Sequence, residues 1–119
     1  MELQISRNIE RFIDLLKLPQ CQIDEVVEFN DKPPFGLRLE IHNERLMLTS
    51  WALDEHDVDL KQALKMNFPG RFGGLPQRIF IIKNLMYIST LCPPNYDAHQ
   101  WFSVCQKQRQ FLVQFDGGH

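Results

Sequence analysis

The sequence predicts a single α+β domain in which an antiparallel sheet is accompanied by three helices, in the order helix, strands, helix, strands, helix. Three observations lead to this class. The chain has 119 residues, 44% of them hydrophobic, which suffices for one modest core. Apolar residues recur at helical spacing near both ends, and they alternate at strand spacing in two segments between. We place the domain at residues 1–116 and expect 117–119 to form a flexible tail.

The first element is an amphipathic helix over residues 5–17. Leu15 lies on the shoulder of its apolar stripe, and the helix should end at Leu18-Pro19, because the residue before a proline avoids the α region. Residues 22–29 that follow are compatible with a short strand. The stripe has spacings of three and four residues and consists of Ile5, Ile9, Phe12, Ile13 and Leu16.

Residues 35–51 predict a hairpin with a two-residue turn at Asn43-Glu44. The turn places Leu39 opposite Leu48 on an apolar face. The other face is polar apart from Met47. This hairpin should therefore cover a core on one side only.

A second helix is expected over residues 54–67, with acidic residues at its N-terminal end, followed by a loop over 68–76. A second hairpin over residues 79–88 turns at Lys83-Asn84 and is apolar on both faces. One face consists of Ile79, Ile81, Met86 and Ile88, and the other of Phe80, Ile82, Leu85 and Tyr87.

The second hairpin presents more apolar surface than one layer of helices can cover. The first and last helices could sandwich it, or it could take part in self-association with the second helix. A partner peptide along a sheet edge or along the first helix is a further possibility, and Leu15 and Met47 would mark such a site. The last helix should begin at a cap near Asn95 or Asp97. Its stripe consists of Ala98, Trp101, Cys105, Gln108, Leu112 and Phe115.

Charge is unevenly placed along a chain whose net charge is −2. Residues 24–59 contain ten acids and three bases, whereas residues 60–119 contain two acids and seven bases. Such halves can pair within the domain or between two copies of it. The overall balance argues against a nucleic-acid binder, and no apolar run is long enough to span a bilayer.

Candidates for catalysis and metal binding are few, and we expect no cofactor. The three cysteines, Cys21, Cys92 and Cys105, lack metal or disulfide spacing and should act as small buried hydrophobes in a reducing cytosol. A thiol near His99 leaves a small Cys/His hydrolase open as an alternative. The strongest metal-ligand cluster also fits a solvated helix start, and it consists of Asp54, His56, Asp57 and Asp59.

The element order, over about residues 5–115, resembles the class I type III secretion chaperones, the Tir-chaperone-like group of bacterial pathogens. The resemblance is carried by the end of the first helix, the second helix and the end of the strand pair. The matching segments are Leu15-Leu16-Lys17-Leu18-Pro19, Ala63-Leu64-Lys65-Met66-Asn67 and Leu91-Cys92-Pro93.

The resemblance implies a dimer in the bacterial cytoplasm that binds the extended N-terminal segment of a secreted effector or gatekeeper protein and delivers it for export. The dimer partner would be a second copy or another small subunit. A regulatory subunit that binds a folded partner is the main alternative. The implied dimer contact consists of Leu60, Ala63, Leu64, Phe80 and Tyr87. The implied cargo contact consists of Phe12, Leu15, Leu37 and Met47.

Overall fold

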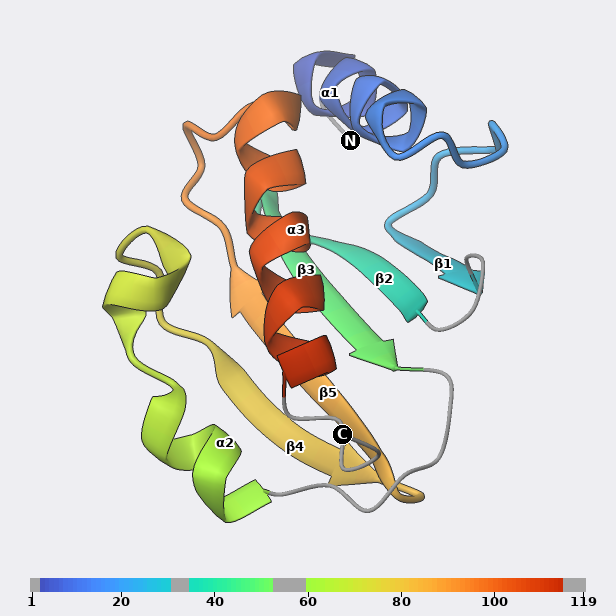
Figure 1. Ribbon diagram of the computed structural model, residues 1–119. Helices are drawn as coiled ribbons and strands as arrows, with labels where there is room; N and C mark the ends of the chain where they lie inside the picture. Colours follow the sequence, from blue (N-terminus) through green and yellow to red (C-terminus); the bar gives the residue numbers. More distant parts are fainter. Residues whose placement is uncertain (1–2, 31–34, 53–59, 115–119) are drawn as a thin grey trace.

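The computed structural model describes residues 3–30, 35–52 and 60–114 (Figure 1). It confirms the predicted α+β class and element order. Residues 54–59, Phe115 and the tail 117–119 lie outside the described residues. The elements are α1 (Leu3–Leu15), β1 (Val26–Asn30), β2 (Phe35–His42), β3 (Arg45–Ala52), α2 (Leu60–Met66), the 3₁₀ helix η1 (Pro69–Phe72), β4 (Arg78–Ile82), β5 (Leu85–Leu91) and α3 (Ala98–Gln114).

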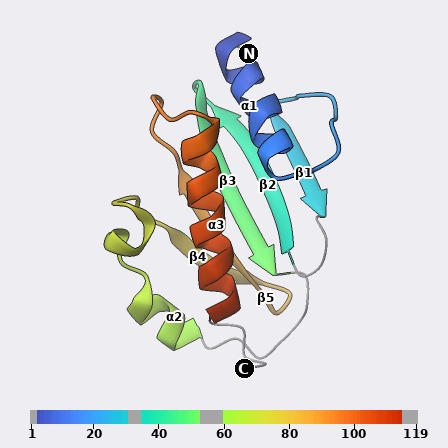
Figure 2. The ribbon, with the colours of Figure 1, turned by 45° about the horizontal axis from the view of Figure 1, so that its top comes forward.

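The five strands form one antiparallel sheet in the order β1-β2-β3-β5-β4. Helices α1 and α3 lie on the same face of this sheet, and α2 lies beside its β4 edge in both ribbon views (Figures 1 and 2). The second hairpin is therefore not sandwiched between the first and last helices. Among the described residues, the sheet has one face covered by helices and one open face.

Both hairpins have the predicted register, and both turn through two residues in the left-handed region. The φ angles are 51° and 62° at Asn43 and Glu44, and 51° and 65° at Lys83 and Asn84. Turns with two such residues match the right-handed twist of paired strands, so each fixes its register. In the first hairpin Leu39 pairs with Leu48, as the alternation predicts.

The first helix ends earlier than predicted. Helix α1 stops at Leu15, because Lys17 adopts a left-handed φ of 59°. The Leu18 amide donates to the Ile13 carbonyl at 3.1 Å and the Lys17 amide to Asp14 at 3.0 Å, which is the Schellman pattern. The predicted helix end at residue 17 is therefore two residues too late.

The last helix, α3, begins at Ala98 and is capped by Asp97, one of the two predicted caps. The Asp97 side chain accepts a hydrogen bond from the Gln100 amide at 3.0 Å, and the Gln100 side chain accepts one from the Asp97 amide at 2.8 Å. This reciprocal arrangement satisfies two backbone donors that the first turn would leave unpaired. The helix buries a stripe against the sheet that consists of Ala98, Trp101, Val104, Cys105, Gln108, Phe111 and Leu112.

The core lies between the covered face of the sheet and the two long helices. Phe12 of α1 meets Trp101 of α3 edge to face, with ring centroids 6.0 Å apart. Leu37 and Leu48 of the first hairpin are fully buried beneath these helices. The helices thus pack on each other as well as on the sheet, which fixes the face they cover.

A buried polar cluster ties α3 to the sheet at one point. Ser50 on β3 donates a hydrogen bond to the side-chain oxygen of Gln108 at 2.7 Å. The side-chain NH₂ group of Gln108 donates hydrogen bonds to the Leu48 carbonyl at 3.1 Å and to the side-chain oxygen of Gln77 at 3.0 Å. Because a buried amide is stable only when it is hydrogen-bonded, this cluster sets the position of α3 over β3.

We predict that Gln108→Met lowers the free energy of unfolding by about 2–4 kcal/mol, because it leaves the Ser50 hydroxyl and the Gln77 side chain without their buried partner. Urea unfolding followed by circular dichroism measures the loss. Gln106→Met is the matched control, since Gln106 lies exposed on the same helix. Equal stability of the two variants would contradict the role assigned to the cluster.

Candidate functional site

The open face of the sheet carries a hollow of about 760 Å³ whose lining comes from all five strands. Side chains alternate between the two faces of a strand, so every second residue of each strand points to this side. The hollow has an aromatic part over β3, β5 and β4 and a polar part toward β1 and β2. A large concave surface with apolar lining and a few polar groups is typical of a binding site.

The aromatic part is a row of three stacked rings on neighbouring strands. Trp51 on β3 pairs in register with Tyr87 on β5, and their ring centroids lie 5.1 Å apart at 26°. Tyr87 pairs in turn with Phe80 on β4, at 5.3 Å and 12°. We call Trp51, Tyr87 and Phe80 the aromatic row. Trp51 is only 7% exposed, whereas Phe80 is 38% exposed, so the row opens toward the β4 edge.

Gly36 on β2 makes room for the first ring of this row. It is the register partner of Trp51, and a Cβ atom built on Gly36 would lie 2.1 Å from the indole. No side chain larger than hydrogen fits beneath the ring, so the glycine allows the indole to lie flat on the sheet. The predicted hairpin register already contains this pairing, although Gly36 and Trp51 are not among the predicted site residues.

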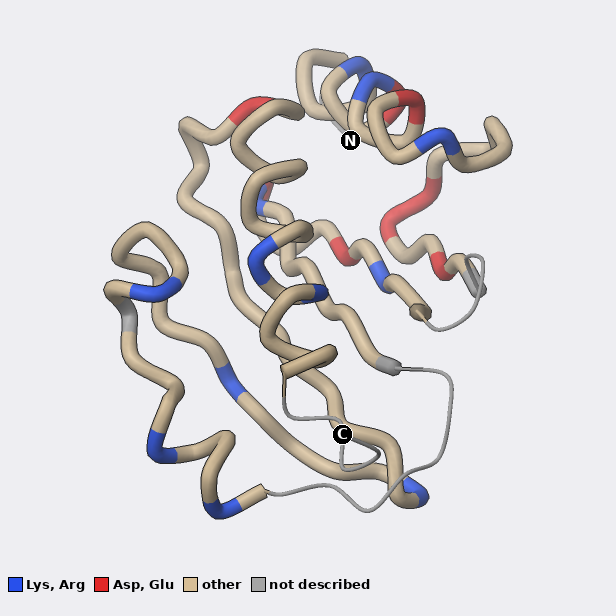
Figure 3. Tube along the Cα trace, in the orientation of Figure 1, with Lys and Arg blue, Asp and Glu red and all other residues tan. Residues whose placement is uncertain are grey.

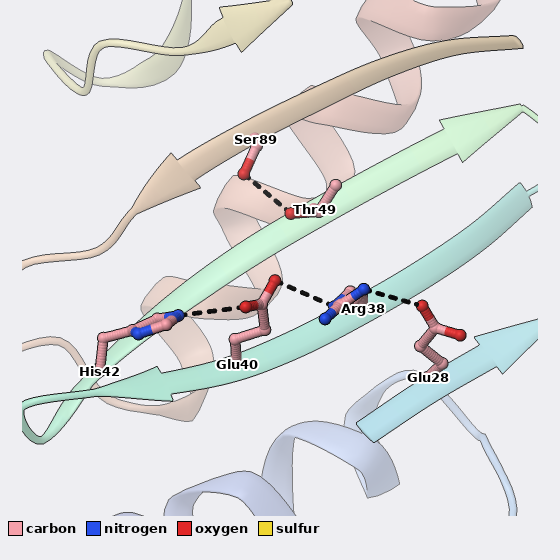
Figure 4. Close-up of polar contacts among 6 residues, drawn as sticks. All are labelled: Glu28, Arg38, Glu40, His42, Thr49 and Ser89. Carbon is pink, nitrogen blue, oxygen red and sulfur yellow. Dashed lines mark hydrogen bonds and ion pairs between the residues drawn. The ribbon is translucent and has the colours of Figure 1, made fainter. Parts of the chain in front are cut away.

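The polar part is a chain of ion pairs along β2, with a hydroxyl pair beside it (Figure 4). Arg38 lies 3.4 Å from a Glu28 oxygen and 3.0 Å from a Glu40 oxygen, and Glu40 also pairs with His42 at 3.1 Å. The charge of Arg38 is thereby shared between two carboxylates. Such exposed pairs add little stability, and one arginine against two carboxylates leaves this part of the face with a small net negative charge. The hydroxyls of Thr49 and Ser89 lie 2.8 Å apart.

Arg78 on β4 is the charged residue at the other end of the hollow. It is exposed and has no ion pair or hydrogen bond of its side chain in the described part of the chain. Figure 3 shows Lys and Arg predominating around α2 and β4, and Asp and Glu gathering toward β1 and β2. From residue 60 to residue 91 the sequence has five Lys and Arg and no Asp or Glu.

The structure brings together two of the five predicted dimer residues. Phe80 and Tyr87 stack in the aromatic row, while Leu64 lies 52% exposed on α2 beside the same sheet edge and Leu60 is half-buried. Ala63 is fully buried and therefore has no surface for a partner to contact.

The four predicted cargo residues divide between the core and the surface. Phe12 and Leu37 are completely buried, because they form the contact between α1, α3 and the sheet. Because Phe12 and Leu37 are buried, the prediction that they contact cargo at the surface is corrected here. Leu15 on α1 and Met47 on β3 are half-buried, and Met47 lines the hollow together with Phe80 and Tyr87.

Two of the three cysteines, Cys92 and Cys105, are buried and poorly placed to react. Burial raises the pKa of the Cys92 thiol to about 12, despite the opposing effect of Arg45 nearby. Cys105 is also buried, whereas His99 is exposed. Cys21 is exposed, so the prediction that all three cysteines are buried is wrong there. A thiol with so high a pKa stays protonated at neutral pH and is a poor nucleophile.

No group of three or more potential metal ligands occurs within residues 3–30, 35–52 and 60–114. The candidate cluster Asp54, His56, Asp57 and Asp59 lies outside these ranges. No helix in the same ranges has the length and apolar character needed to cross a membrane.

The fold is shared with a chain in the solved structure of the HopA1–SchA chaperone–effector complex. The TM-score is 0.69 at 16% sequence identity, and the match covers 95% of this chain and 93% of that chain. The protein is therefore built like a class I type III secretion chaperone, as the resemblance in the sequence predicts.

The chain belongs to the SsaM family, which matches residues 2–115. A relative in Salmonella typhimurium (strain LT2), the secretion system apparatus protein SsaM, is 30% identical over 115 residues. This match covers 93% of this chain and 92% of the relative. The sequence match establishes the family, and the likeness to the chaperone–effector complex establishes the fold.

We predict that Gly36→Ala lowers the free energy of unfolding by about 1–3 kcal/mol and increases the exposure of Trp51, because the added methyl displaces the indole. Urea unfolding and a red shift in tryptophan emission measure the two effects. Gly70→Ala is the control, since the nearest atom to its Cβ would be 3.5 Å away. An unchanged emission spectrum would contradict the close approach of Gly36 and Trp51.

We expect iodoacetamide to alkylate Cys21 in the native protein at about pH 8 while Cys92 and Cys105 react only in denaturant. Mass spectrometry of the peptides distinguishes the three cysteines.

Because the Cys92 pKa is raised from 9.0 to about 12, the unfolded chain loses this proton first as the pH rises. The contribution of Cys92 should therefore lower the stability as the pH rises through that window, and Cys92→Ala should reduce this dependence. Rapid native alkylation of Cys92 would contradict its burial.

Proposed function

We propose that this protein is a bacterial cytoplasmic chaperone that binds the extended N-terminal segment of a secreted effector or gatekeeper protein and keeps it ready for type III export. The observation that carries the proposal is the open face of the sheet, where the described helices leave a hollow that includes Met47 uncovered, in a chain that shares its fold with a chain of a chaperone–effector complex. The solved HopA1–SchA structure, which shares this fold, is a complex of a chaperone with an effector, and this supports the proposal.

Leu15 and Met47 are the proposed cargo contacts. They lie on opposite sides of the sheet, on α1 and on the open face, and α1 lies over the β1–β2 end of the sheet in both ribbon views (Figures 1 and 2). An extended segment that touches both must run around the sheet, which a folded domain of similar size does less readily. Ordering such a segment costs several kcal/mol, so a large contact is compatible with release without nucleotide hydrolysis.

The proposed dimer contact is the β4 side of the molecule. Leu64, Phe80 and Tyr87 supply exposed or half-exposed apolar surface there, with Leu60 at its border. An apolar patch of this kind on a small protein typically marks an interface. The second subunit is either a copy of this chain or another small chaperone subunit.

A second candidate function is that of a regulatory or structural subunit that binds a folded partner. The description of the Salmonella relative as a secretion system apparatus protein favours this alternative. Limited proteolysis of the complex separates the two functions. A chaperone protects an extended N-terminal segment of its partner, whereas an apparatus subunit protects a folded domain.

We expect Leu15→Asp combined with Met47→Asp to weaken capture of the N-terminal segment of the secreted partner by about tenfold or more, because each change places a charge in an apolar contact. Co-expression with the tagged segment, followed by titration of the purified proteins, measures the loss. Leu3→Asp is the matched control, since Leu3 is 64% exposed on the same helix. Full capture by the double variant would contradict the proposed cargo site.

A further inference from the structure

A second, smaller pocket lies at the end of the molecule where α1 and the first turn of α3 are side by side (Figures 1 and 2). Its volume is about 140 Å³, and it shares no described lining residue with the hollow on the open face. Three parts of the chain form its walls: the start of α1, the β2–β3 turn with the start of β3, and the segment that joins β5 to α3. We call it the end pocket.

Hydrogen bonds between distant segments hold the walls of the end pocket in place. The Cys92 amide donates to the Leu46 carbonyl at 2.8 Å, and the Arg45 side chain donates to the Cys92 carbonyl at 3.1 Å. The Tyr96 amide donates to the Pro93 carbonyl at 3.2 Å, which closes the turn before α3. The walls are therefore preformed, as is usual for a ligand site.

The buried side of the end pocket contains a hydrogen-bond donor without a partner. Trp101 on α3 lines the pocket and is 2% exposed, and its indole N–H has no acceptor within the described part of the chain. The ring meets Phe12 edge to face, which holds the indole in place. Buried indole N–H groups in proteins usually have a partner, because an unpaired buried donor is costly. A ligand that brings an acceptor to this pocket relieves that cost.

The charge at the end pocket limits which acceptor it favours. Glu44, exposed on the β2–β3 turn, is the one charged residue among the described residues that line it. Arg7 on α1 and Asp97 at the α3 cap are exposed and are not part of this lining. Glu2, which lies outside the described residues, adds another acid to this end of the sequence. An anionic ligand is therefore repelled by Glu44, whereas a lysine or arginine side chain has no acceptor to offer the indole N–H.

A carboxamide meets both requirements and has the right size. Its oxygen accepts from the indole N–H, and its NH₂ group donates to side-chain oxygens, which Gln4, Asn8 and Glu44 supply around the pocket. An apolar cavity of about 150 Å³ holds one benzene molecule. A pocket of about 140 Å³ therefore has room for one glutamine or asparagine side chain but not for the backbone that bears it.

We infer that the end pocket binds the side-chain amide of a glutamine or asparagine from a partner polypeptide whose backbone stays outside the pocket. Trp101 donates to the amide oxygen, while the buried side chains of Ile5 and Leu46 contact the methylene groups. The inference stands apart from the proposed function, because the pocket is not lined by the proposed cargo contacts Leu15 and Met47.

Four blocked tripeptides test the ligand chemistry on the ¹⁵N-labelled full chain. One is acetyl-Gly-Gln-Gly-N-methylamide, and in the others Gln is replaced by Glu, Lys or Leu, so that only the central side chain differs. The indole N–H signal of Trp101 reports on the end pocket, and that of Trp51 on the open face reports changes elsewhere. We expect the Gln peptide to shift the Trp101 signal and to bind about fivefold or more tightly than each analogue. Its Kd should be about 1 mM, because few atoms are buried.

Two variants test the roles of individual residues. Glu44→Gln should raise the affinity of the Glu peptide about threefold or more, because it removes the repelling carboxylate, and Glu10→Gln should not. Glu10 is exposed on α1, it does not line the pocket, and its replacement changes the net charge equally. Trp101→Phe keeps a ring against Phe12 but removes the donor, so it should abolish the preference for Gln over Leu, followed through the backbone amide signal of Leu46. If Trp101→Phe fails to fold, the peptide series and Glu44→Gln decide.

Equal binding of the four peptides would overturn the inference, as would tighter binding of the Glu, Lys or Leu peptide or no Trp101 shift with any of them. An unchanged affinity of the Glu peptide in Glu44→Gln would overturn it as well. The test uses no secreted segment, so its result is separate from that of the proposed function. Loss of the Gln preference with intact capture of a secreted segment overturns the inference alone, whereas loss of capture with intact preference overturns the chaperone function alone.

Discussion

The packing of α1 and α3 on a single face of the sheet is the constraint on which the rest of the structure depends. The edge-to-face contact of Phe12 with Trp101 joins the two helices, and the buried amide of Gln108 fixes α3 over β3. Because both long helices, α1 and α3, pack on that side, neither of them covers the opposite face of the sheet. A two-layer domain with apolar residues on both faces of one hairpin therefore leaves apolar surface for other chains.

The sequence predicts the sheet well, because local turn chemistry determines it. Two-residue turns at Asn43-Glu44 and Lys83-Asn84 fix the hairpin register, and the alternation of residues then assigns each one to a face. The same arithmetic pairs Gly36 with Trp51, so the close approach beneath the indole could have been found from the sequence. The joining of β3 to β5 is a long-range contact, and it is this contact that completes the aromatic row.

The sequence fails where burial is decided by contacts between distant elements. A helical stripe shows that Phe12 is apolar and faces inward, but only the packing of α1 on α3 shows that no partner can reach it. The family resemblance implies a cargo contact at Leu37, but this side chain is buried on the covered side of the sheet. The end of α1 depends on the left-handed conformation of Lys17, which residues other than glycine adopt rarely and which the sequence gives little reason to expect.

The gradient of exposure along the aromatic row explains how one surface can be both stable and available. Trp51 is covered by neighbours from its own chain and contributes to the stability of the isolated domain, whereas Phe80 keeps more than a third of its surface exposed. The three rings stack one after another, from Trp51 to Tyr87 to Phe80. An apolar side chain that covers Phe80 therefore extends a stack that is already formed. The conformational cost on this side of the interface is therefore small.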